Sequence, residues 1–355
     1  MRDRHTAPTS EGSQVADATV TDRQPFAPCG SLPYSLVCLS GARHDAVAVV
    51  GSCRAGTEEG AEVDPLNYFI AAGALKVASA NTWTRRAYRT ATTLKTGPRK
   101  AIVQEALWCI EGLPDQPQRL MDLGTGWAHV LCVFCALLRR QDELHAFDTE
   151  DMRNWPSFQA TLPIIRDQVL SLPLDSAARE HAERRADQLS RAGDFDAAYR
   201  AMGLQYHCSA SGCPDFPEGT FDRIMSIDVL EHVDADTFPS AVRTWHRILK
   251  PGGQFVAQVG LDDHLAFFQG RFGSKRYLRY SERAWRVLIG NSVQYINRLT
   301  SSQIIGLLTD AGFSIDSIET DSSGDTAPSD VHPDYRNQSE ADIRAVRLMV
   351  RARKR

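Results

Sequence analysis

The chain has 355 residues, of which 43% are hydrophobic and 24% are charged, and its formal net charge is −4 at pH 7. This composition is typical of a globular protein and excludes collagen-like, coiled-coil and wholly disordered chains. The acidic balance gives no overall basic surface for nucleic acid or an anionic membrane, so we expect neither as a partner.

Residues 1–25 are polar, contain almost no large apolar side chains and are expected to form a disordered tail. They lack the apolar core of a secretory signal, and no apolar run in the sequence reaches 18 residues. We therefore expect a cytoplasmic protein without a transmembrane helix. In that compartment the eight scattered cysteines are predicted to be free thiols.

Residues 26–112 are predicted to form an N-terminal extension that is mostly helical. Within it, the apolar runs of residues 26–64 are compatible with two short strands or with a flap. From Pro65 onward, apolar residues recur at three- and four-residue spacing, which favours helices. The last of these, AIVQEALWCIEGL, ends at Gly112.

Residues 113–355 alternate between strand-like and helix-like segments. RLMDLGTG, VLCVFCALLRR and DELHAFD predict a β-α-β unit, and a charged helical insertion follows at 149–203. The alternation resumes with strands at LQYHC and FDRIMSIDV, a helix to Ile248, a tight KPGG turn and a strand at QFVAQVG. After a second insertion at 261–299, SSQIIGLLTDAGF predicts a helix, and FSIDSIE and IRAVRLMVRAR predict strands. The alternation indicates a doubly wound α/β sheet.

The segment MDLGTGWA carries the strongest chemical signal. An acidic residue, Asp122, ends a strand, and a glycine-rich turn opens a helix whose first N–H groups are free. Asp148 ends the next strand, 24 residues after Gly124, where a carboxylate can bind both hydroxyls of a ribose. The pattern fits a nucleoside-containing cofactor, although a purely structural turn has the same pattern. A dinucleotide is disfavoured because His129 occupies the place of the third fingerprint glycine.

Three phrases in order, DLGTGW, FDRIMSIDVLEHV and LKPGGQFV, resemble the class I S-adenosylmethionine (SAM)-dependent methyltransferases. The resemblance covers about residues 115–355 without the insertion at 149–203. It implies a seven-stranded Rossmann-like sheet, SAM as cofactor and S-adenosylhomocysteine as product. It also implies methyl transfer to an oxygen, or less favourably a nitrogen, of a small metabolite or sugar-bearing molecule.

The resemblance also implies roles for individual residues. The glycine-rich turn would shape the pocket for the methionine part of SAM, Asp148 would hold the ribose, and Asp228 would lie near the reacting methyl group. Ser209 and Ala210 would lie near adenine, where an acidic residue is more usual. The implied cofactor-binding residues are Asp122, Leu123, Gly124, Thr125, Gly126, Asp148, Ser209, Ala210 and Asp228.

His264 is the candidate general base, because it follows a strand that should end at the cofactor edge of the sheet. Asp263, or Asp262, would orient it; alternatively, these residues only cap a helix that starts at Leu265. Glu231 and His232 form a tempting acid–base pair, but we interpret them as structural, at the start of a helix, with His232 packed beneath the cofactor.

The second insertion supplies candidate substrate-binding residues, which alternatively only pack a lid onto the main domain. They are Arg279, Tyr280, Trp285, Asn297 and Arg298. Cys132 and Cys135 have the spacing of a zinc pair, but no second pair matches them, so we expect core cysteines. No metal is expected, although Asp228, Asp262 and Asp263 leave a divalent cation as an open alternative.

Two rival functions remain. A nicotinamide-dependent oxidoreductase is disfavoured by the missing third glycine and by the lack of a Y-x-x-x-K pair in the sequence. A non-catalytic SAM-binding protein would keep the same cofactor residues, since binding does not prove turnover. The sequence does not predict the oligomeric state.

Overall fold

The computed structural model describes residues 69–70, 72–76, 102–140, 142–267, 275–292, 295–322 and 330–355. The predicted tail at 1–25, the ambiguous segment 26–64 and most of the helical extension lie outside these ranges. Residues 69–70 and 72–76 are helical, and α3 (Ile102–Ile110) confirms the helix predicted from AIVQEALWCIEGL.

The sheet has seven strands in the order β3-β2-β1-β4-β5-β7-β6. The first five of these, in spatial order, are parallel, and β7 is antiparallel to both β5 and β6. The strand order reverses between β1 and β4, which in open α/β sheets is where ligands bind, outside the carboxyl ends. The predicted doubly wound, seven-stranded sheet is confirmed. The strands are β1 (Arg119–Leu123), β2 (Glu143–Asp148), β3 (Leu204–Cys208), β4 (Phe221–Ile227), β5 (Leu249–Gly260), β6 (Phe313–Asp321) and β7 (Arg347–Lys354).

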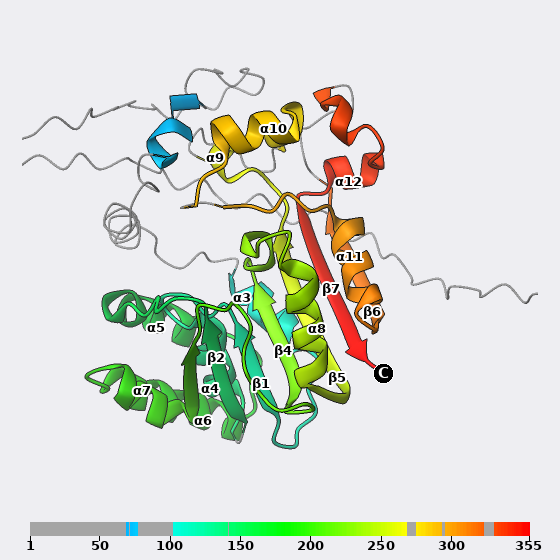
Figure 1. The fold of residues 1–355 in the computed structure, drawn as a ribbon. Helices are drawn as coiled ribbons and strands as arrows, with labels where there is room; N and C mark the ends of the chain where they lie inside the picture. Colours follow the sequence, from blue (N-terminus) through cyan, green and yellow to red (C-terminus); the bar gives the residue numbers. More distant parts are fainter. Residues whose placement is uncertain are drawn as a thin grey trace, which may run out of the picture.

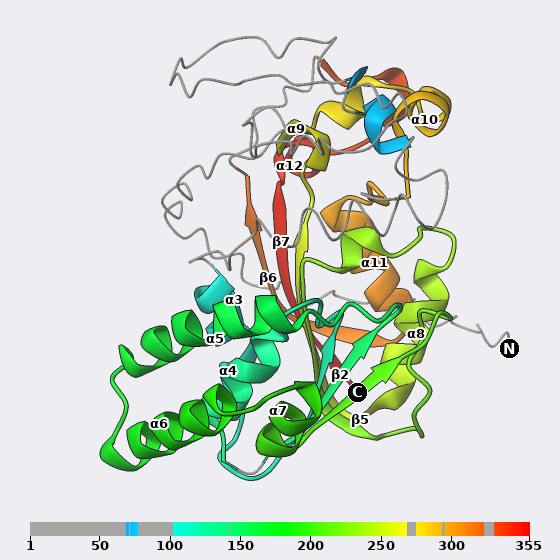
Figure 2. The ribbon, with the colours of Figure 1, turned by 90° about the vertical axis from the view of Figure 1, so that its left-hand side faces the viewer.

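Helices cover both faces of the sheet, so its strands are apolar on both sides (Figure 2). On one face lie α3 and α4 (Val130–Leu138) with the three helices of the first insertion, α5 (Trp155–Leu170), α6 (Ser176–Ser190) and α7 (Phe195–Met202). On the other face lie α8 (Phe238–Ile248) and α11 (Ser301–Asp310). None of the helices in these described ranges has the length and apolar character of a membrane-spanning segment.

The helices of the first insertion begin where the sequence supplies a capping side chain. Asn154, Asp175 and Asp194 each accept a hydrogen bond from the backbone N–H three residues later. Such caps satisfy N–H groups that the helix itself leaves unpaired. The segment predicted as a helical insertion at 149–203 contains α5, α6 and α7, which pack on α4.

The second insertion lies beyond the carboxyl ends of the parallel strands (Figure 1). It contains α9 (His264–Phe267), η2 (Arg276–Arg279), α10 (Glu282–Ala284) and η3 (Trp285–Ile289). We call residues 275–292 and 295–299 the cover segment. Its apolar side chains form a core cluster of their own with η5 (Pro333–Tyr335) and α12 (Glu340–Arg344).

Three sequence predictions were wrong in detail. The KPGG turn lies inside β5 as an irregularity in its pairing with β4. Leu249 pairs with Phe221, and the next pair is Gln254 with Arg223, so the residues between Leu249 and Gln254 bulge out of the ladder. Glu231 and His232 lie in the short turn η1 (Leu230–His232) rather than at the start of a helix. The predicted closing strand begins only at Arg347, because the Ser339 side chain caps α12 over the preceding residues.

Candidate functional site

The glycine-rich turn after β1 is shaped by its contact with the residues that follow β4. Gly124 has φ +80° and donates its N–H to the carbonyl of Phe147. A Cβ atom on Gly124 would lie 2.9 Å from Val229 Cβ and closer still to its methyl carbons. Gly126 also has positive φ, but a Cβ there would meet nothing within 4 Å. Only glycine therefore fits at Gly124, where the turn and η1 come together.

Two buried carboxyl groups end β1 and β2 beside this turn. Burial raises the pKa of Asp122 to about 6, against hydrogen bonds from Thr125 and Cys132. Burial and the charge of Asp122 raise the pKa of Asp148 to about 7, although the Gly126 N–H and the Tyr206 hydroxyl, each 3.4 Å from it, oppose the shift. Carboxyl groups held at such a cost are typical of a binding site.

His129 replaces the third fingerprint glycine and joins the turn to the first insertion. It adopts a left-handed backbone conformation, and its side chain is fully buried. Its Nδ1 lies 2.9 Å from Thr125 Oγ1 and its Nε2 2.8 Å from the Tyr199 hydroxyl. Burial lowers the pKa of His129 to about 4, so the ring is neutral. The sequence indicates only the missing glycine at this position, and nothing in it predicts the contact with Tyr199.

The remaining predicted cofactor residues lie along the same edge. The Ser209 N–H donates to the Asp148 carbonyl at 3.0 Å, so Ser209 and the exposed Ala210 follow directly beside the β2 carboxyl. Asp228 has φ 54° and is held by both the backbone and the side chain of Gln258. An open glycine turn, flanked by carboxyl groups on successive strand ends, fits a ligand that carries an ammonium group and a ribose.

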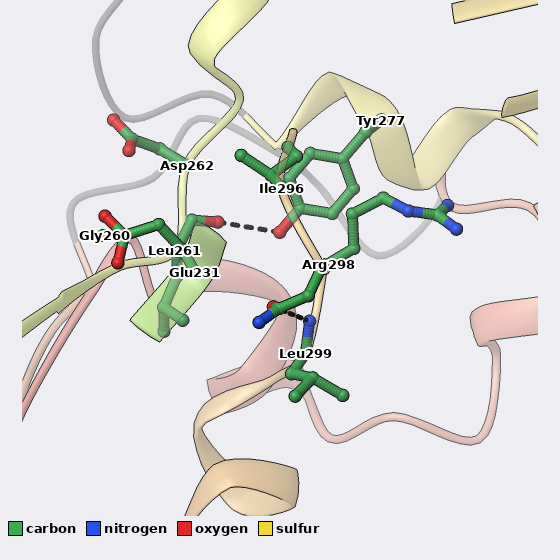
Figure 3. Close-up of a pocket in the computed structure, with 9 residues that line it drawn as sticks. Glu231, Gly260, Leu261, Asp262, Tyr277, Ile296, Arg298 and Leu299 are labelled. Atoms are coloured by element: carbon green, nitrogen blue, oxygen red, sulfur yellow. Dashed lines mark hydrogen bonds between the residues drawn. The ribbon is translucent and has the colours of Figure 1, made fainter. Parts of the chain in front are cut away.

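A small pocket of about 10 Å³ lies between η1, the end of β5 and the cover segment (Figure 3). The Tyr277 hydroxyl donates to the Leu261 carbonyl at 2.7 Å and thereby holds the cover segment to the end of β5. A volume of this size holds about one water molecule, so the cover segment as it stands leaves no room for a substrate there. Its lining residues are Glu231, Gly260, Leu261, Asp262, Tyr277, Ile296, Asn297, Arg298 and Leu299.

Two of the predicted substrate residues, Asn297 and Arg298, line this pocket, and both also make structural contacts. The Asn297 amide donates to the carbonyls of Leu230 and Val233, which anchors the cover segment to η1. The Arg298 guanidinium bonds to Glu282 and to the Tyr335 hydroxyl and lies over the Trp285 ring.

The other predicted substrate residues lie farther out on the cover segment. Trp285 is 7% exposed within the local core, and Arg279 forms an exposed ion pair with Asp330. Tyr280 contacts Phe69 edge-on, with ring centroids 5.7 Å apart. A substrate role for these five residues stays a prediction.

The catalytic candidates lie next to this pocket. Asp263 is buried and accepts from the Leu265 N–H at 2.9 Å, so the capping contact exists, while the base role of His264 stays a prediction. The ring of His264 lies 5.0 Å from that of His232. His232 is exposed, and its packing beneath the cofactor stays a prediction. Cys132 and Cys135 are buried as predicted.

Comparison with known proteins places this geometry in a family. A family model described as a methyltransferase domain matches residues 97–318. No curated protein matches the chain. Similar solved structures include the 4+2 cyclase SpnF, with 15% identity over 73% of this chain and 83% of that chain and a TM-score of 0.42.

Two further similar structures are methyltransferases by description. An S-adenosylmethionine-dependent methyltransferase from Mesorhizobium loti is 16% identical over 72% of this chain and 96% of its own, with a TM-score of 0.38. A phosphoethanolamine N-methyltransferase from Haemonchus contortus is 15% identical over 71% of this chain and 52% of its own, with a TM-score of 0.39.

Proposed function

Because the chain belongs to the methyltransferase-domain family, with SAM as its methyl donor, we propose that it methylates an oxygen, or less favourably a nitrogen, of a small metabolite or sugar-bearing molecule. The observation that carries this proposal is the convergence at one sheet edge of the Gly124 turn, Asp122, Asp148 and Asp228. We propose that the acceptor meets the methyl group where this edge adjoins the cover segment.

SAM supplies an electrophilic methyl group on a sulfonium sulfur, which leaves as S-adenosylhomocysteine when the carbon–sulfur bond breaks. The chain must align the acceptor oxygen with that bond, and such alignment is worth about 7–11 kcal/mol in favourable cases. The acceptor also loses a proton. We propose that the proton leaves at the imidazole side of the pocket, where His264 lies, and general-base help of this kind contributes about 10²–10⁴-fold.

The cover segment supports a small acceptor. Hydrogen bonds from Tyr277 and Asn297 hold it over the strand ends, so the acceptor side of the site is covered and is not an open surface. The net charge of −4 also disfavours a nucleic acid as the acceptor.

The first experiment is calorimetric titration of the full chain with SAM, S-adenosylhomocysteine and, as a control, NADPH. We expect saturable binding of the first two, weakened at least tenfold in Asp148→Ala. Asp151→Ala is the matched control, because that carboxylate is half exposed and pairs with Arg153. Binding of NADPH instead would overturn the proposal in favour of an oxidoreductase.

Turnover is then measured as S-adenosylhomocysteine released in the presence of panels of small hydroxyl and amine compounds. Release that depends on a hydroxyl acceptor supports O-methylation, and release that depends only on amines assigns N-methylation. SAM binding without release on either panel would favour the non-catalytic SAM-binding protein.

A further inference from the structure

We propose that Glu231, His232 and His264 form a binding site for one divalent first-row transition-metal cation at the wall of the acceptor pocket. One ligand atom from each of the three side chains lies within 4.8 Å of the other two. Atoms that bind one ion tetrahedrally at about 2.1 Å lie about 3.4 Å apart. A bound ion therefore requires each ligand atom to move inward by up to about 0.8 Å.

The sheet topology brings the three residues together. Glu231 and His232 follow β4 in η1, and His264 follows β5 at the start of α9. Strands β4 and β5 are adjacent and parallel, so the segments after their carboxyl ends lie side by side. The two imidazoles lie with ring centroids 5.0 Å apart, although the residues are 32 positions apart in the sequence.

The backbone fixes His232 in the form that binds a metal. Its Nδ1 lies at hydrogen-bond distance from the Tyr295 carbonyl, which can only accept, so Nδ1 carries the proton. The lone pair of the neutral ring is then on Nε2. A hydrogen bond from the second nitrogen to a carbonyl is the usual support of a histidine that ligates a metal.

Glu231 provides a second, independent observation. The residue is 4% exposed, and its carboxylate oxygen Oε2 is buried without a hydrogen-bond partner in the described part of the chain. Its other oxygen, Oε1, would lie 3.0 Å from a Cβ on Gly260, and the backbone of Glu231 and Gly260 hydrogen-bonds to the carboxyl group. A buried carboxylate oxygen without a partner is costly, and a cation coordinated by that oxygen would offset the cost.

The charges around the cluster also favour a cation. The carboxyl groups of Asp228 and Asp262 lie near enough to Glu231 to act on it electrostatically. Arg298 lines the same pocket, but its guanidinium is held by Glu282 and Tyr335 and points away from the carboxylates of Glu231 and Asp262 (Figure 3).

Two imidazoles and one carboxylate suit Zn²⁺, Mn²⁺, Fe²⁺ or Co²⁺ better than Mg²⁺ or Ca²⁺, which prefer all-oxygen ligands. Three protein ligands leave coordination positions open toward the pocket. With the cation bound, an acceptor hydroxyl coordinated to it would have a lowered pKa and could release its proton to water, and His264 would serve as a ligand; the base role proposed above for His264 applies to the metal-free site. This catalytic use rests on the proposed function; the cation site itself does not.

The test is a Co²⁺ titration of the full chain after metal removal with EDTA, followed by the visible absorption of the bound ion. It is repeated with Glu231→Gln, which keeps the side-chain shape, and with His264→Ala, which alters a partly exposed residue at the start of α9. His332→Gln is the matched control, because His332 is bonded to Asp334 and is not a member of the cluster. Thermal unfolding of the metal-free proteins verifies that each variant is folded.

We expect the wild type and His332→Gln to bind one more equivalent of Co²⁺ than the two ligand variants, or to bind it at least tenfold more tightly. The proposal is overturned if all four proteins give the same Co²⁺ titration curve. It is also overturned if the absorption of the wild type does not saturate as Co²⁺ is added. If Glu231→Gln does not fold, His264→Ala alone decides. SAM calorimetry on the same samples separates the proposals: SAM binding without Co²⁺ binding overturns only the cation site, and the reverse overturns only the methyltransferase function.

Discussion

Gly124 is the glycine on which the shape of the cofactor edge depends most. Its φ of +80° costs a non-glycine residue about 1–2 kcal/mol, and a Cβ would also overlap the methyl groups of Val229. Overpacking of this kind adds about 1–3 kcal/mol. We predict that Gly124→Ala lowers the free energy of unfolding by about 2–5 kcal/mol, measured by chemical denaturation, and weakens SAM binding at least tenfold.

The matched control is Gly126→Ala in the same turn, where φ is +64° and a Cβ would meet nothing. Its free energy of unfolding should fall only by the cost of a positive φ in a non-glycine residue, about 1–2 kcal/mol. Adding Val229→Ala to Gly124→Ala should recover stability by removing the overlap. Equal losses for the two single variants would show that contact with Val229 does not matter.

Asp148 should make the protein without ligand less stable as pH rises. Its pKa is raised from 3.8 to about 7 by burial and by Asp122, with a smaller contribution from Asp151. A group whose pKa is raised on folding contributes full stability below its unfolded pKa and loses it as pH rises through its folded pKa. We therefore predict that Asp148→Asn stabilises the protein at pH 8, by about 1–4 kcal/mol, and has little effect at pH 4.5.

The measurement is chemical denaturation of both proteins at the two pH values, with SAM affinity determined at pH 8. The variant should be more stable, because it removes the buried carboxylate, and should bind SAM more weakly if Asp148 binds the ribose as predicted. A stability difference that does not depend on pH would contradict the raised pKa of Asp148. Asp151→Asn is the control for a nearby carboxylate that is half exposed.

At the scale of helices and strands, the sequence was informative where apolar residues form continuous runs. RLMDL and ELHAFD predict strands, and the structure confirms both as strands buried along nearly their whole length. The errors lie where a few side-chain contacts decide the backbone. The Ser339 cap converts the start of a predicted strand into α12, and His129 joins the glycine turn to Tyr199. Neither contact follows from periodicity or from local propensity.

The stability of the cover segment should depend more on the buried Arg298 than on the exposed ion pairs of the segment. Arg298 has a 7% exposed side chain, bonds to two groups at once and lies over Trp285, so a lysine cannot replace its planar fork. We predict that Arg298→Lys costs about 1–3 kcal/mol of local stability. Hydrogen exchange of residues 275–292 should become faster, while SAM affinity changes less than twofold.

Arg279→Lys is the matched control, because the Arg279–Asp330 pair is exposed and such pairs contribute about 0–1 kcal/mol. It should leave hydrogen exchange unchanged. If Arg298→Lys also leaves exchange unchanged but raises the KM of an identified acceptor, then Arg298 binds substrate, as the sequence analysis predicted, and its packing role is secondary.

For the whole molecule, the order of the strands determines what the site contains. The sequence analysis assigned His232 and His264 separate roles, because nothing local relates two segments 32 residues apart. Their proximity follows only from β4 and β5 being neighbours in the sheet. The motif residues after β1 and β4 could be assigned to one site in advance, since the resemblance implied cofactor-binding roles for them. The position of the buried Glu231 beside two imidazoles could be seen only in the structure.

The last strand of the chain lies inside the sheet, so its loss should affect the whole molecule. Strand β7 pairs with β5 on one side and β6 on the other, and Leu348, Val350 and Ala352 are fully buried. Deletion of residues 347–355 leaves two unpaired strand edges and an opened core. We predict that this truncated chain loses cooperative unfolding and SAM binding.

Circular dichroism during denaturation and SAM calorimetry check this prediction. Deletion of Arg355 alone is the control, because that residue is exposed and its bond to Ser314 lies at the surface, so stability should change by less than about 0.5 kcal/mol. If the nine-residue truncation still unfolds cooperatively and binds SAM, then β1 to β5 form the cofactor site without the antiparallel strands. In that case β6 and β7 would support only the cover segment and α12, and the effect of the truncation would be confined to the acceptor side.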